Sequence, residues 1–433
     1  MLLNFRLRNY RSFRDEQRLA LQGDPALEPL RAVALYGANA SGKTNLLRAL
    51  RFGHDAVARS HQTWRPDEGI KGRAPFLLGS SADEPTAVEF VVQVGQTRYV
   101  YGFECDRTAF VREWLYRYST NRRTLLFERS SPTEIRFGRA LGGPNALVAE
   151  TMRPNSLFLS AAAASNHQGV RAIYHWLSTH FAYIGPQDRE FRLRESLEQL
   201  EGSEAAGRLQ QTLALLRAAD VGIVDVSVVR EPISDEQATM MGRFLALLEE
   251  SAPQSMPSNA LDDLLAFASR RFRFAHQGET SKPTTLEIDD ESYGTQAVIA
   301  LSGPILDALK IGSCLAVDEL DASLHPHLVA AIVGLFKSPE SNPRGAQLIF
   351  TTHDTSLLSK APGTERVLDR REVWFVDKGS DGESSLVPLS DFSPRQAADF
   401  ERTYLQGRYG GVPLLGRLDA ALTWDPHRPA SAT

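Results

Sequence analysis

The sequence predicts an α/β protein built on a buried parallel sheet. Three apolar runs carry this prediction, and each ends at glycine, acidic or polar residues: "AVALY" at 32–36, "SCLAV" at 313–317 and "QLIF" at 347–350. Such runs are typical of parallel strands that are covered on both faces. The first run leads through a glycine loop into "KTNLLRAL", where Leu46, Leu47 and Leu50 have helical spacing. The predicted order there is strand, loop, helix.

Composition limits the class of protein. The chain has 433 residues, 42% of them hydrophobic, which is enough to bury the cores of two lobes or domains. A formal net charge of -5 argues against a protein that coats nucleic acid through bulk charge, although a local basic groove does not show in that sum. Cys105 and Cys314 offer no disulfide framework and no metal-binding spacing. With no signal peptide and no apolar run of about 18 residues, a cytoplasmic location without membrane insertion is expected.

Changes in residue pattern predict five segments. Alternating apolar residues at 88–94 and 99–105 indicate two strands of an antiparallel meander, and "LQQTLALLRAA" at 209–219 has helical spacing. Residues 231–260 are rich in Pro, Ser, Asp and Met, and we expect a mobile or partner-contacting connector around one helix there. The segments are a first half of the core with the glycine loop (1–60), an inserted antiparallel β subdomain (61–150), a helical lobe and connector (151–270), the second half of the core (271–395), and a C-terminal segment with a disordered tail (396–433).

The glycine loop carries the pattern G-x-x-x-x-G-K-T, formed by Gly37, Gly42, Lys43 and Thr44. Glycines at these positions let backbone N–H groups surround phosphates, the lysine reaches the β and γ oxygens, and the threonine hydroxyl binds magnesium. The helix that starts at this loop adds the positive end of its dipole. A chance match in a glycine-bearing turn is the alternative. The strand before the loop and the helix after it favour a nucleoside triphosphate site.

A second candidate phosphate contact lies in "DDESYGTQ" at 289–296, just before the helix predicted from "AVIALSGPILDAL". A turn that opens a helix presents N–H groups and a dipole to an anion, so Ser292 and Gly294 can hold a γ-phosphate. Taken in isolation, the same residues are also explained as a plain helix cap.

Two of the predicted strands end in residues that are suited to hydrolysis. Asp318 follows "SCLAV" and is suited to hold magnesium, and Glu319 beside it is suited to polarise an attacking water. His353 follows "LIFTT" and can contact the γ-phosphate or position water. Adjacent acids also occur in structural turns, and a lone histidine is usually structural. The phosphate loop upstream favours the catalytic interpretation of all three residues.

The order of these motifs resembles that of ABC-type ATPases, specifically the SMC-, RecF- and OLD-like branch. The resemblance is carried by "NYRSF" at 9–13, "GANASGKTN" at 37–45, "ESYGTQ" at 291–296, "DELDASLHP" at 318–326 and "THD" at 352–354. It extends through "NSLFLSAAA" and "FERTYLQGRYGGVP" and so covers nearly the whole chain. Within this branch the chain is most similar to stand-alone AAA-domain ATP-binding proteins of bacterial defence islands, such as RloA-, PtuA- and AriA-like ATPases. A P-loop NTPase fold of ABC-ATPase type is implied.

The resemblance implies ATP and Mg²⁺ as cofactors. Thr44 and Asp318 would bind the metal, and Glu319 and His353 would be catalytic. The nucleotide would lie against the phosphate loop and its neighbours, which are Gly37, Asn39, Ala40, Ser41, Gly42, Lys43, Thr44, Asn45, Arg11 and Ser12. For Arg11 and Ser12, a role as a strand end is the alternative.

The resemblance also implies a head-to-head homodimer. The signature of the second subunit, which is Ser292, Gly294 and Thr295, would close over the nucleotide, and Asp321 would lie in a loop at the interface. The family usually has a glutamine after an "FLSAAA"-like segment, whereas this chain has "ASNHQ" at 164–168. Either Gln168 or Asn166 takes the role of that glutamine toward magnesium and water, or the role is missing.

Three other features have two interpretations each. Tyr404, Arg408 and Tyr409 either dock a partner or pack on the ATPase lobe. "HPH" at 325–327 suggests a metal site or, in better agreement with its neighbours, a loop with solvent-facing histidines. Larger nuclease relatives carry a TOPRIM domain rich in acidic metal ligands. No paired-carboxylate pattern follows Asp391 here, so any nuclease is expected to be a separate protein.

The expected function is an ATP-hydrolysing switch that dimerises around ATP, with a higher oligomer left open. It would act as a sensor or scaffold that controls a separately encoded effector in anti-phage defence. The alternative is a RecF- or SMC-like DNA-repair ATPase that clamps DNA. Arginines in "ASRRFRF" at 268–274, together with Arg122 and Arg123, support that alternative, whereas the acidic balance and the lack of a long coiled coil oppose it. An energy-supplying subunit of a membrane transporter is disfavoured by the divergent signature.

Overall fold

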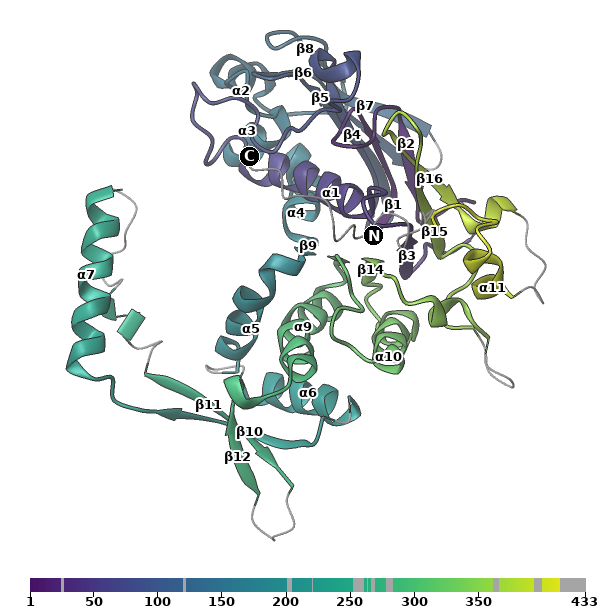
Figure 1. Ribbon diagram of the computed structural model, residues 1–433. Coiled ribbons are helices and arrows are strands. Elements are labelled where there is room, and N and C mark those ends of the chain that lie inside the picture. The colour runs from purple at the N-terminus through teal and green to yellow at the C-terminus, as the bar shows by residue number, and fades with distance from the viewer. Residues whose placement is uncertain are drawn as a thin grey trace, which may run out of the picture. The chain divides into compact units, whose positions relative to one another are not determined.

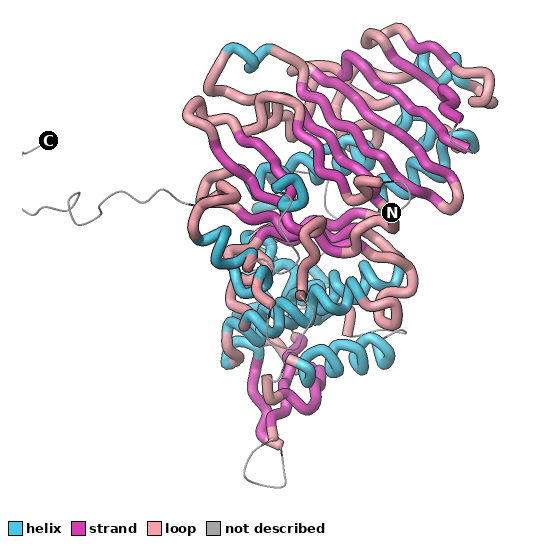
Figure 2. The backbone as a smooth tube through the Cα atoms, turned by 90° about the vertical axis from the view of Figure 1, so that its right-hand side faces the viewer, coloured by secondary structure: helices cyan, strands magenta, loops and turns pink. Residues whose placement is uncertain are grey.

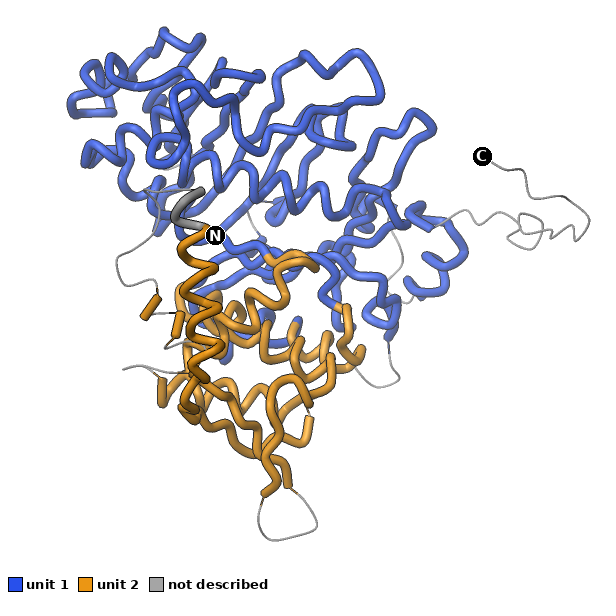
Figure 3. Tube along the Cα trace, turned by 60° about the vertical axis from the view of Figure 1, so that its left-hand side comes forward, with its two compact units in different colours: residues 1–183, 312–320, 333–433 blue, residues 184–311, 321–332 orange. Residues whose placement is uncertain are grey.

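The structure is a computed structural model that describes residues 1–24, 27–119, 122–200, 205–219, 221–251, 261–262, 264–265, 269–277, 283–360, 366–392 and 399–412. The chain divides into two compact units (Figure 3). Unit 1 comprises residues 1–183, 312–320 and 333–433, and unit 2 comprises residues 184–311 and 321–332. The predicted tail at 424–433 lies outside the described residues. The elements are labelled in Figure 1.

Within the described residues, unit 1 contains an antiparallel sheet of seven strands in the order β2-β1-β4-β5-β6-β7-β8 (Figure 2). The strands are β1 Leu2–Arg8, β2 Gln17–Ala20, β4 Thr86–Val94, β5 Thr97–Cys105, β6 Phe110–Ser119, β7 Arg122–Arg129 and β8 Ile135–Phe137. The apolar residues that alternate along β4 and β5 are buried, as their spacing predicts. Because β1 pairs with β4, the meander expected as an insertion at 61–150 is continuous with the first strands of the chain.

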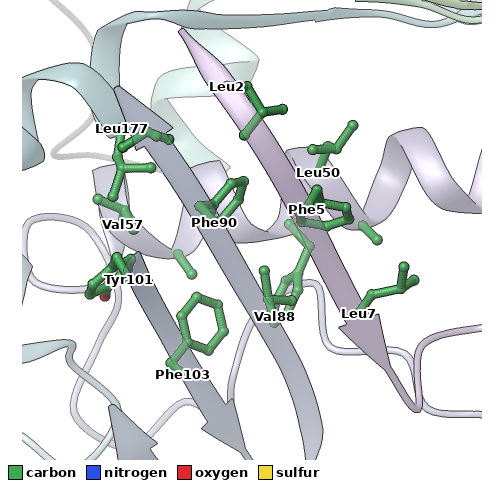
Figure 4. Close-up of a cluster of buried hydrophobic side chains, with 14 of the residues drawn as sticks. Leu2, Phe5, Leu7, Leu50, Val57, Val88, Phe90, Tyr101, Phe103 and Leu177 are labelled. Atoms are coloured by element: carbon green, nitrogen blue, oxygen red, sulfur yellow. The ribbon is translucent and has the colours of Figure 1, made fainter. Parts of the chain in front are cut away.

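Helices cover the inner face of this sheet. They are α1 Lys43–Arg59, α2 Asn145–Thr151, α3 Phe158–Ala164 and α4 Arg171–Thr179. Figure 4 shows Phe5 and Phe90, from neighbouring strands, beside Leu50 and Val57 of α1. A Cβ atom added to Gly53 of α1 would lie 2.5 Å from the ring of Phe90, so the helix packs directly on the strands. This contact fixes the helix that starts at the phosphate loop.

The other sheet of unit 1 has the order β16-β15-β3-β14-β13-β9 in the described part of the chain. Its strands are β3 Ala32–Tyr36, β9 Phe181–Ile184, β13 Cys314–Val317, β14 Gln347–Thr351, β15 Val373–Lys378 and β16 Ser384–Pro388. β3 pairs in parallel with β14 and β15, and β13 pairs in parallel with β14. Every residue of β3, β13 and β14 is buried, which confirms the predicted parallel sheet. The carboxyl ends of these strands therefore meet at one edge, where ligands bind in open α/β sheets.

Unit 2 combines helices with a small antiparallel sheet. Its helices are α5 Arg189–Glu198, α6 Ala205–Ala218, α7 Asp235–Ser251 and α9 Tyr293–Ile311, and its sheet is formed by β10 Ile223–Arg230, β11 Arg270–His276 and β12 Thr284–Glu287. α5 lies against α9, because a Cβ atom on Gly303 would be 2.6 Å from Ser196 Oγ. A helical lobe was expected here, whereas the three-stranded sheet was not. Two further helices are α10 Pro326–Lys337 and α11 Phe400–Leu405.

Candidate nucleotide-binding site

The loop between β3 and α1 is tightly folded because its glycines leave no room for side chains. A Cβ atom on Gly42 would lie 2.4 Å from Ser384 Oγ, and the φ angle of Gly42 is 118°, a value that favours glycine. A Cβ atom on Gly37 would lie 2.3 Å from the carbonyl oxygen of Val376. Since α1 begins at Lys43, the N–H groups of its first turn point toward the loop. The loop is therefore a cradle for an anion.

Lys43 places a positive charge inside this cradle. Only 7% of the residue is exposed, and its ammonium group donates to the carbonyl oxygens of Gly37 at 2.7 Å and Ala38 at 3.0 Å. The hydroxyl of Ser41 is also buried here and has no hydrogen-bond partner among the described residues. A buried hydroxyl without a partner beside a buried ammonium group is suited to phosphate oxygens.

Asp318, directly after β13, joins three segments of the site. Its Oδ1 accepts hydrogen bonds from the Thr44 hydroxyl at 3.1 Å and from the Thr351 hydroxyl at 2.7 Å. Asp318 is 4% exposed, so these donors stabilise a carboxylate that is largely shielded from water. Thr44 and Asp318 thus present two oxygen atoms side by side, the kind of ligand that Mg²⁺ prefers.

Glu319 follows Asp318 with a φ angle of 56°, which is uncommon for a residue with a side chain. Its backbone N–H donates to Thr351 Oγ1 at 2.6 Å, so the same threonine hydroxyl fixes both acids. The Glu319 side chain is exposed and lines a pocket. A carboxylate held by strained backbone at the end of a buried strand is suited to orient a water and take its proton.

These residues share one pocket of about 490 Å³, a volume within the usual range for small-molecule sites. His353 is exposed at the end of β14 and contributes to the wall. The Tyr36 hydroxyl donates to the carbonyl oxygen of Asp354 at 2.9 Å, which ties the histidine segment to the strand before the loop. The pocket is lined by Ser12, Asn39, Ala40, Ser41, Gly42, Lys43, Thr44, Asn45, Asp318, Glu319, Thr351, His353 and Lys378.

Two residues of "NYRSF", Arg11 and Ser12, were predicted to contact the nucleotide, and only one of them lines the pocket. Ser12 lines the pocket, and its Oγ accepts a hydrogen bond from Asn45 Nδ2 at 2.9 Å. Arg11 is exposed and does not line the pocket, and its backbone N–H donates to Ala74 O. Arg11 therefore fits the strand-end alternative, whereas Ser12 supports the phosphate loop.

The predicted signature lies in unit 2 and forms a helix start. α9 begins at Tyr293, so Gly294 and Thr295 lie in its first turn rather than before the helix. Ser292 Oγ accepts the backbone N–H of Thr295 at 3.1 Å, as an N-cap residue does. This capping role explains Ser292 without any contact to a second subunit. Because Ser292 is exposed, the turn is also accessible to a further ligand.

Asp321 lies in a turn next to this signature. Its carbonyl oxygen accepts the backbone N–H of Leu324 at 3.1 Å, and Ser323 within the turn has a φ angle of 65°. A Cβ atom on Gly294 would be 3.0 Å from the carbonyl oxygen of Ser323. Within unit 2, therefore, the turn of Asp321 and the start of α9 form one surface.

Three residues of the phosphate site belong to no predicted motif. Thr351 precedes "THD" and was overlooked because hydroxyl residues at strand ends are common. Lys378 ends β15 and lines the pocket, and Ser384 starts β16 and packs against Gly42. The only signal for Thr351 is its place at the end of the strand beside β13. The positions of Lys378 and Ser384 at the site depend on how β15 and β16 pair in the sheet, which local sequence patterns do not show.

Other predicted residues lie outside the pocket. Gln168 and Asn166 are exposed, and neither lines it, which favours the interpretation that the glutamine role is missing. Tyr404 and Tyr409 are buried and stack on Phe375 with ring centroids 5.2 and 5.4 Å away, which confirms packing rather than docking for both. Arg408 between them is exposed.

The histidines of "HPH" do not form a metal site with other side chains in the described residues. His325 and His327 are exposed, with ring centroids 5.0 Å apart. No group of three or more His, Cys, Asp or Glu side chains with the geometry to hold a metal ion occurs in the part of the chain that the structure describes. Thr44 and Asp318 would instead hold Mg²⁺ together with phosphate oxygens, as is usual for this ion.

Three of the arginines that suggested DNA binding have partners within the chain. Arg273 forms an ion pair with Glu231 at 2.6 Å, and Arg271 approaches the same carboxylate at 3.7 Å. The guanidinium of Arg123 lies 3.7 Å from the ring centroid of Tyr116. These interactions give the three arginines a structural role within the chain.

Similarity to known proteins agrees with this site. A family model described as "AAA domain, putative AbiEii toxin, Type IV TA system" matches residues 32–359, from the start of β3 to beyond His353. The chain belongs to this AAA family. The match spans the phosphate loop, both acids and the histidine of this AAA ATPase, and the predicted P-loop fold of ABC-ATPase type is confirmed. No curated protein matches the sequence of the chain.

Several solved structures are similar to this AAA ATPase. An SMC head bound to the C-winged helix domain of ScpA has a TM-score of 0.44 and 13% identity, and the alignment covers 90% of this chain and 99% of that chain. The SMC head domain from Thermotoga maritima has a TM-score of 0.40 and 12% identity, with 89% and 98% covered. An Smc head domain with an extended coiled coil, bound to the C-terminal domain of ScpA derived from Pyrococcus furiosus, has a TM-score of 0.38 and 12% identity, with 90% and 97% covered.

Among the described helices, none combines the length and apolar character needed to cross a membrane.

Proposed function

We propose that the protein binds ATP with Mg²⁺ in this pocket, hydrolyses it, and uses the nucleotide state as a switch. The observation that carries the proposal is the link between Asp318 and Glu319 through the Thr351 hydroxyl. This link directs one acid toward Thr44 and leaves the other exposed in the pocket. A site that only bound a Mg²⁺–nucleotide complex would need the first acid as a metal ligand, whereas the second acid is suited to hydrolysis.

Each side chain has a defined task in the proposed reaction. Lys43 and the N–H groups at the start of α1 neutralise the β and γ oxygens of the bound triphosphate. Glu319 accepts a proton from the attacking water, and His353 orients that water or the γ-phosphate. Mg²⁺, when bound at Thr44 and Asp318, supplies positive charge to the phosphate oxygens. The remaining charge is stabilised by groups already held in place, which is the main source of such catalysis.

We further propose that two copies close around ATP. Ser292 is an exposed residue at the start of α9, a helix of 19 residues, with Gly294 and Thr295 in the first turn. Such a helix start attracts anions. The signature of a second copy would therefore contact the γ-phosphate, with the turn of Asp321 beside it. On this proposal the dimer forms with ATP and opens after hydrolysis.

The switch is proposed to act as a sensor or scaffold for a separately encoded effector in anti-phage defence. The family is described by a toxin and a Type IV TA system, which supports a role beside a separate partner. Opening or closing of the dimer would release or activate that partner through its different affinity for the two states. Salt-dependent binding of duplex DNA by the purified protein would instead favour the DNA-repair alternative.

Glu319→Gln tests the proposal. The variant keeps the size of the side chain and removes the proton acceptor. We expect ATP to bind with unchanged affinity, the hydrolysis rate to fall by about 10² to 10⁴, and an ATP-bound dimer to accumulate. Measurements are phosphate release, ATP titration, and light scattering with and without ATP. Glu340→Gln, at an exposed acid outside the pocket, is the matched control.

Three results separate the parts of the proposal. Undiminished hydrolysis by Glu319→Gln would refute the assignment of the general base. Lost hydrolysis without an ATP-dependent dimer would refute the composite site but keep the ATPase. Failure of the wild-type protein to bind ATP would refute the proposal as a whole.

A further inference from the structure

The hairpin of β15 and β16 is fixed on the phosphate loop by Ser384. The Ser384 hydroxyl donates to the carbonyl oxygen of Ser41, and its backbone N–H donates to the carbonyl oxygen of Ser12 at 2.6 Å. The hydroxyl also lies in the space that a side chain at Gly42 would need. Ser384 is 2% exposed, so these bonds are shielded from water. The start of β16 therefore has a defined position beside the loop.

Lys378 is the cross-strand neighbour of Ser384 in this hairpin. The two residues are paired in the antiparallel register of β15 and β16, and residues paired in this way project from the same face of a sheet. Ser384 meets the phosphate loop on that face. Lys378 accordingly extends toward the loop, and it lines the pocket.

The ammonium group of Lys378 forms no ion pair with the residues that the structure describes. Two other lysines of unit 1 are paired: Lys71 with Glu68 at 2.7 Å and Lys337 with Glu372 at 2.6 Å. Lys378 is exposed in the wall of a pocket that is shaped for phosphate. A cation in this setting is suited to a phosphate oxygen, with which it forms a charge-assisted hydrogen bond.

Lys378 and the acid expected to bind Mg²⁺ follow strands on opposite sides of β3. In the sheet order β16-β15-β3-β14-β13, the strand of Lys378 flanks β3 on one side, whereas β13, which leads to Asp318, lies beyond β14 on the other. A metal at Thr44 and Asp318 pairs with the β and γ oxygens of a triphosphate. The α-phosphate is therefore the end of the triphosphate that is left for the side of Lys378.

We propose that Lys378 is a further nucleotide-binding residue, which contacts the α-phosphate of the bound nucleotide. The inference rests on the proposed function of this pocket as an ATP site. A contact to the α-phosphate is the same in ATP and ADP, and it does not change while the γ-phosphate is cleaved. Lys378 therefore helps to retain the nucleotide and leaves the hydrolysis step to other residues.

Lys378→Met tests the proposal, because it removes the charge and keeps an unbranched side chain. We expect the affinities for ADP and for a non-hydrolysable ATP analogue, both with Mg²⁺, to fall by the same factor of about ten in titration calorimetry. KM for ATP should rise by a similar factor, whereas kcat should change by less than about two-fold. Lys378→Arg should restore most of the affinity. Lys360→Met, at an exposed lysine outside the pocket, is the matched control.

Salt provides a readout that a merely structural role of Lys378 would not move. Nucleotide affinity of the wild-type protein should fall as the KCl concentration rises, because salt screens charged contacts. The fall should be shallower in Lys378→Met and as steep as in the wild type in Lys378→Arg, with melting temperatures recorded for both. Equal salt dependence of all three proteins would overturn the proposal.

The remaining outcomes separate this inference from the proposed function. Weakened binding of the ATP analogue with unchanged binding of ADP would overturn the assignment to the α-phosphate. Unchanged affinity for both nucleotides in Lys378→Met would overturn the role of Lys378 while the ATP site stands. A wild-type protein that binds neither nucleotide would refute the proposed function, and the inference would fall with it.

Discussion

The hydroxyl of Thr351 donates a 2.7 Å hydrogen bond to the carboxylate of Asp318. The same hydroxyl accepts the backbone N–H of Glu319 at 2.6 Å. A single side chain at the end of β14 therefore sets the positions of two acids that follow β13. The proposed metal ligand and the proposed base depend on a residue that takes no part in the chemistry.

Thr351→Val should impair hydrolysis while keeping the shape of the core. The variant removes a donor to a carboxylate, and such bonds contribute about 1.5–3 kcal/mol. We expect the rate to fall about ten- to a hundred-fold, with more Mg²⁺ needed for half-maximal activity, because Asp318 is no longer held toward Thr44. Phosphate release over a Mg²⁺ series measures both effects. Thr351→Ser should restore most of the activity, and a serine variant as impaired as the valine variant would contradict this account.

Two substitutions at Ser292 separate a helix cap from a γ-phosphate contact. Ser292→Ala removes the cap of α9 and should lower the free energy of unfolding by about 0.5–2 kcal/mol. Ser292→Asp keeps a good cap and adds a negative charge, so it should retain stability and abolish the ATP-dependent dimer. Thermal melts and light scattering with ATP give the two readouts. A Ser292→Asp protein that dimerises with ATP like the wild type would leave the serine a cap only.

Two helix glycines should respond to alanine in opposite directions. Gly53→Ala in α1 forces a Cβ atom to within 2.5 Å of the Phe90 ring and should destabilise the protein by about 1–3 kcal/mol. Gly334→Ala in α10 meets nothing within 4 Å and should stabilise it by about 0.5–1 kcal/mol. Urea unfolding measures both changes. Equal effects of the two variants would show that α1 does not pack on β4 as described.

Stability should fall on mild acidification. Burial lowers the pKa of His54, whose ring contacts the carbonyl oxygen of Leu177 at 2.9 Å, below the value of about 6.5 that an unfolded histidine has. As pH falls below about 6.5, the unfolded state binds the proton first, so the free energy of unfolding decreases; above that pH the contribution is constant. Burial lowers the pKa of His180 as well.

His54→Gln keeps a hydrogen-bond donor at this position and removes the titratable imidazole. Melting temperatures between about pH 7.5 and pH 5.5 should therefore decline less steeply in this variant than in the wild type. The decline should not vanish, because His180 still titrates. Parallel curves for the two proteins would assign the acid sensitivity to other groups.

The strands whose burial follows from their own pattern of apolar residues were predictable from sequence. β3, β13 and β14 are continuous apolar runs, and β4 and β5 alternate cleanly, so their burial follows from sequence. The sheet of unit 2 was not predicted, because β11 reads as a basic stretch in which arginines outnumber the inward residues Phe272 and Phe274. Its partner β12 has four residues and is mostly exposed. A strand of that kind is defined by its neighbours rather than by its own composition.

The residues of the candidate site also fall into those that local sequence predicts and those that it does not. Gly37, Gly42 and Lys43 belong to a motif whose spacing has a physical reason, so they were found without a structure. Thr351 and Ser384 act through strand order, because β14 lies beside β13 and β16 reaches the loop beyond β15. Strand order arises from the packing of the whole sheet and leaves no local trace in sequence. Further residues of this kind are to be sought at the ends of neighbouring strands.

The central place of β3 has a consequence for the timing of assembly. Ala32 pairs with Leu348 of β14, and Ala34 pairs with Val373 of β15, so both neighbours of this strand come from the far end of the chain. During translation the phosphate loop leaves the ribosome early, but the strands that flank it follow only near the end of synthesis. An unfinished chain contains the residues of the phosphate-loop motif but lacks β14 and β15, the strands that flank β3 in the sheet. A chain truncated before β15 is therefore expected not to shape the phosphate loop for nucleotide.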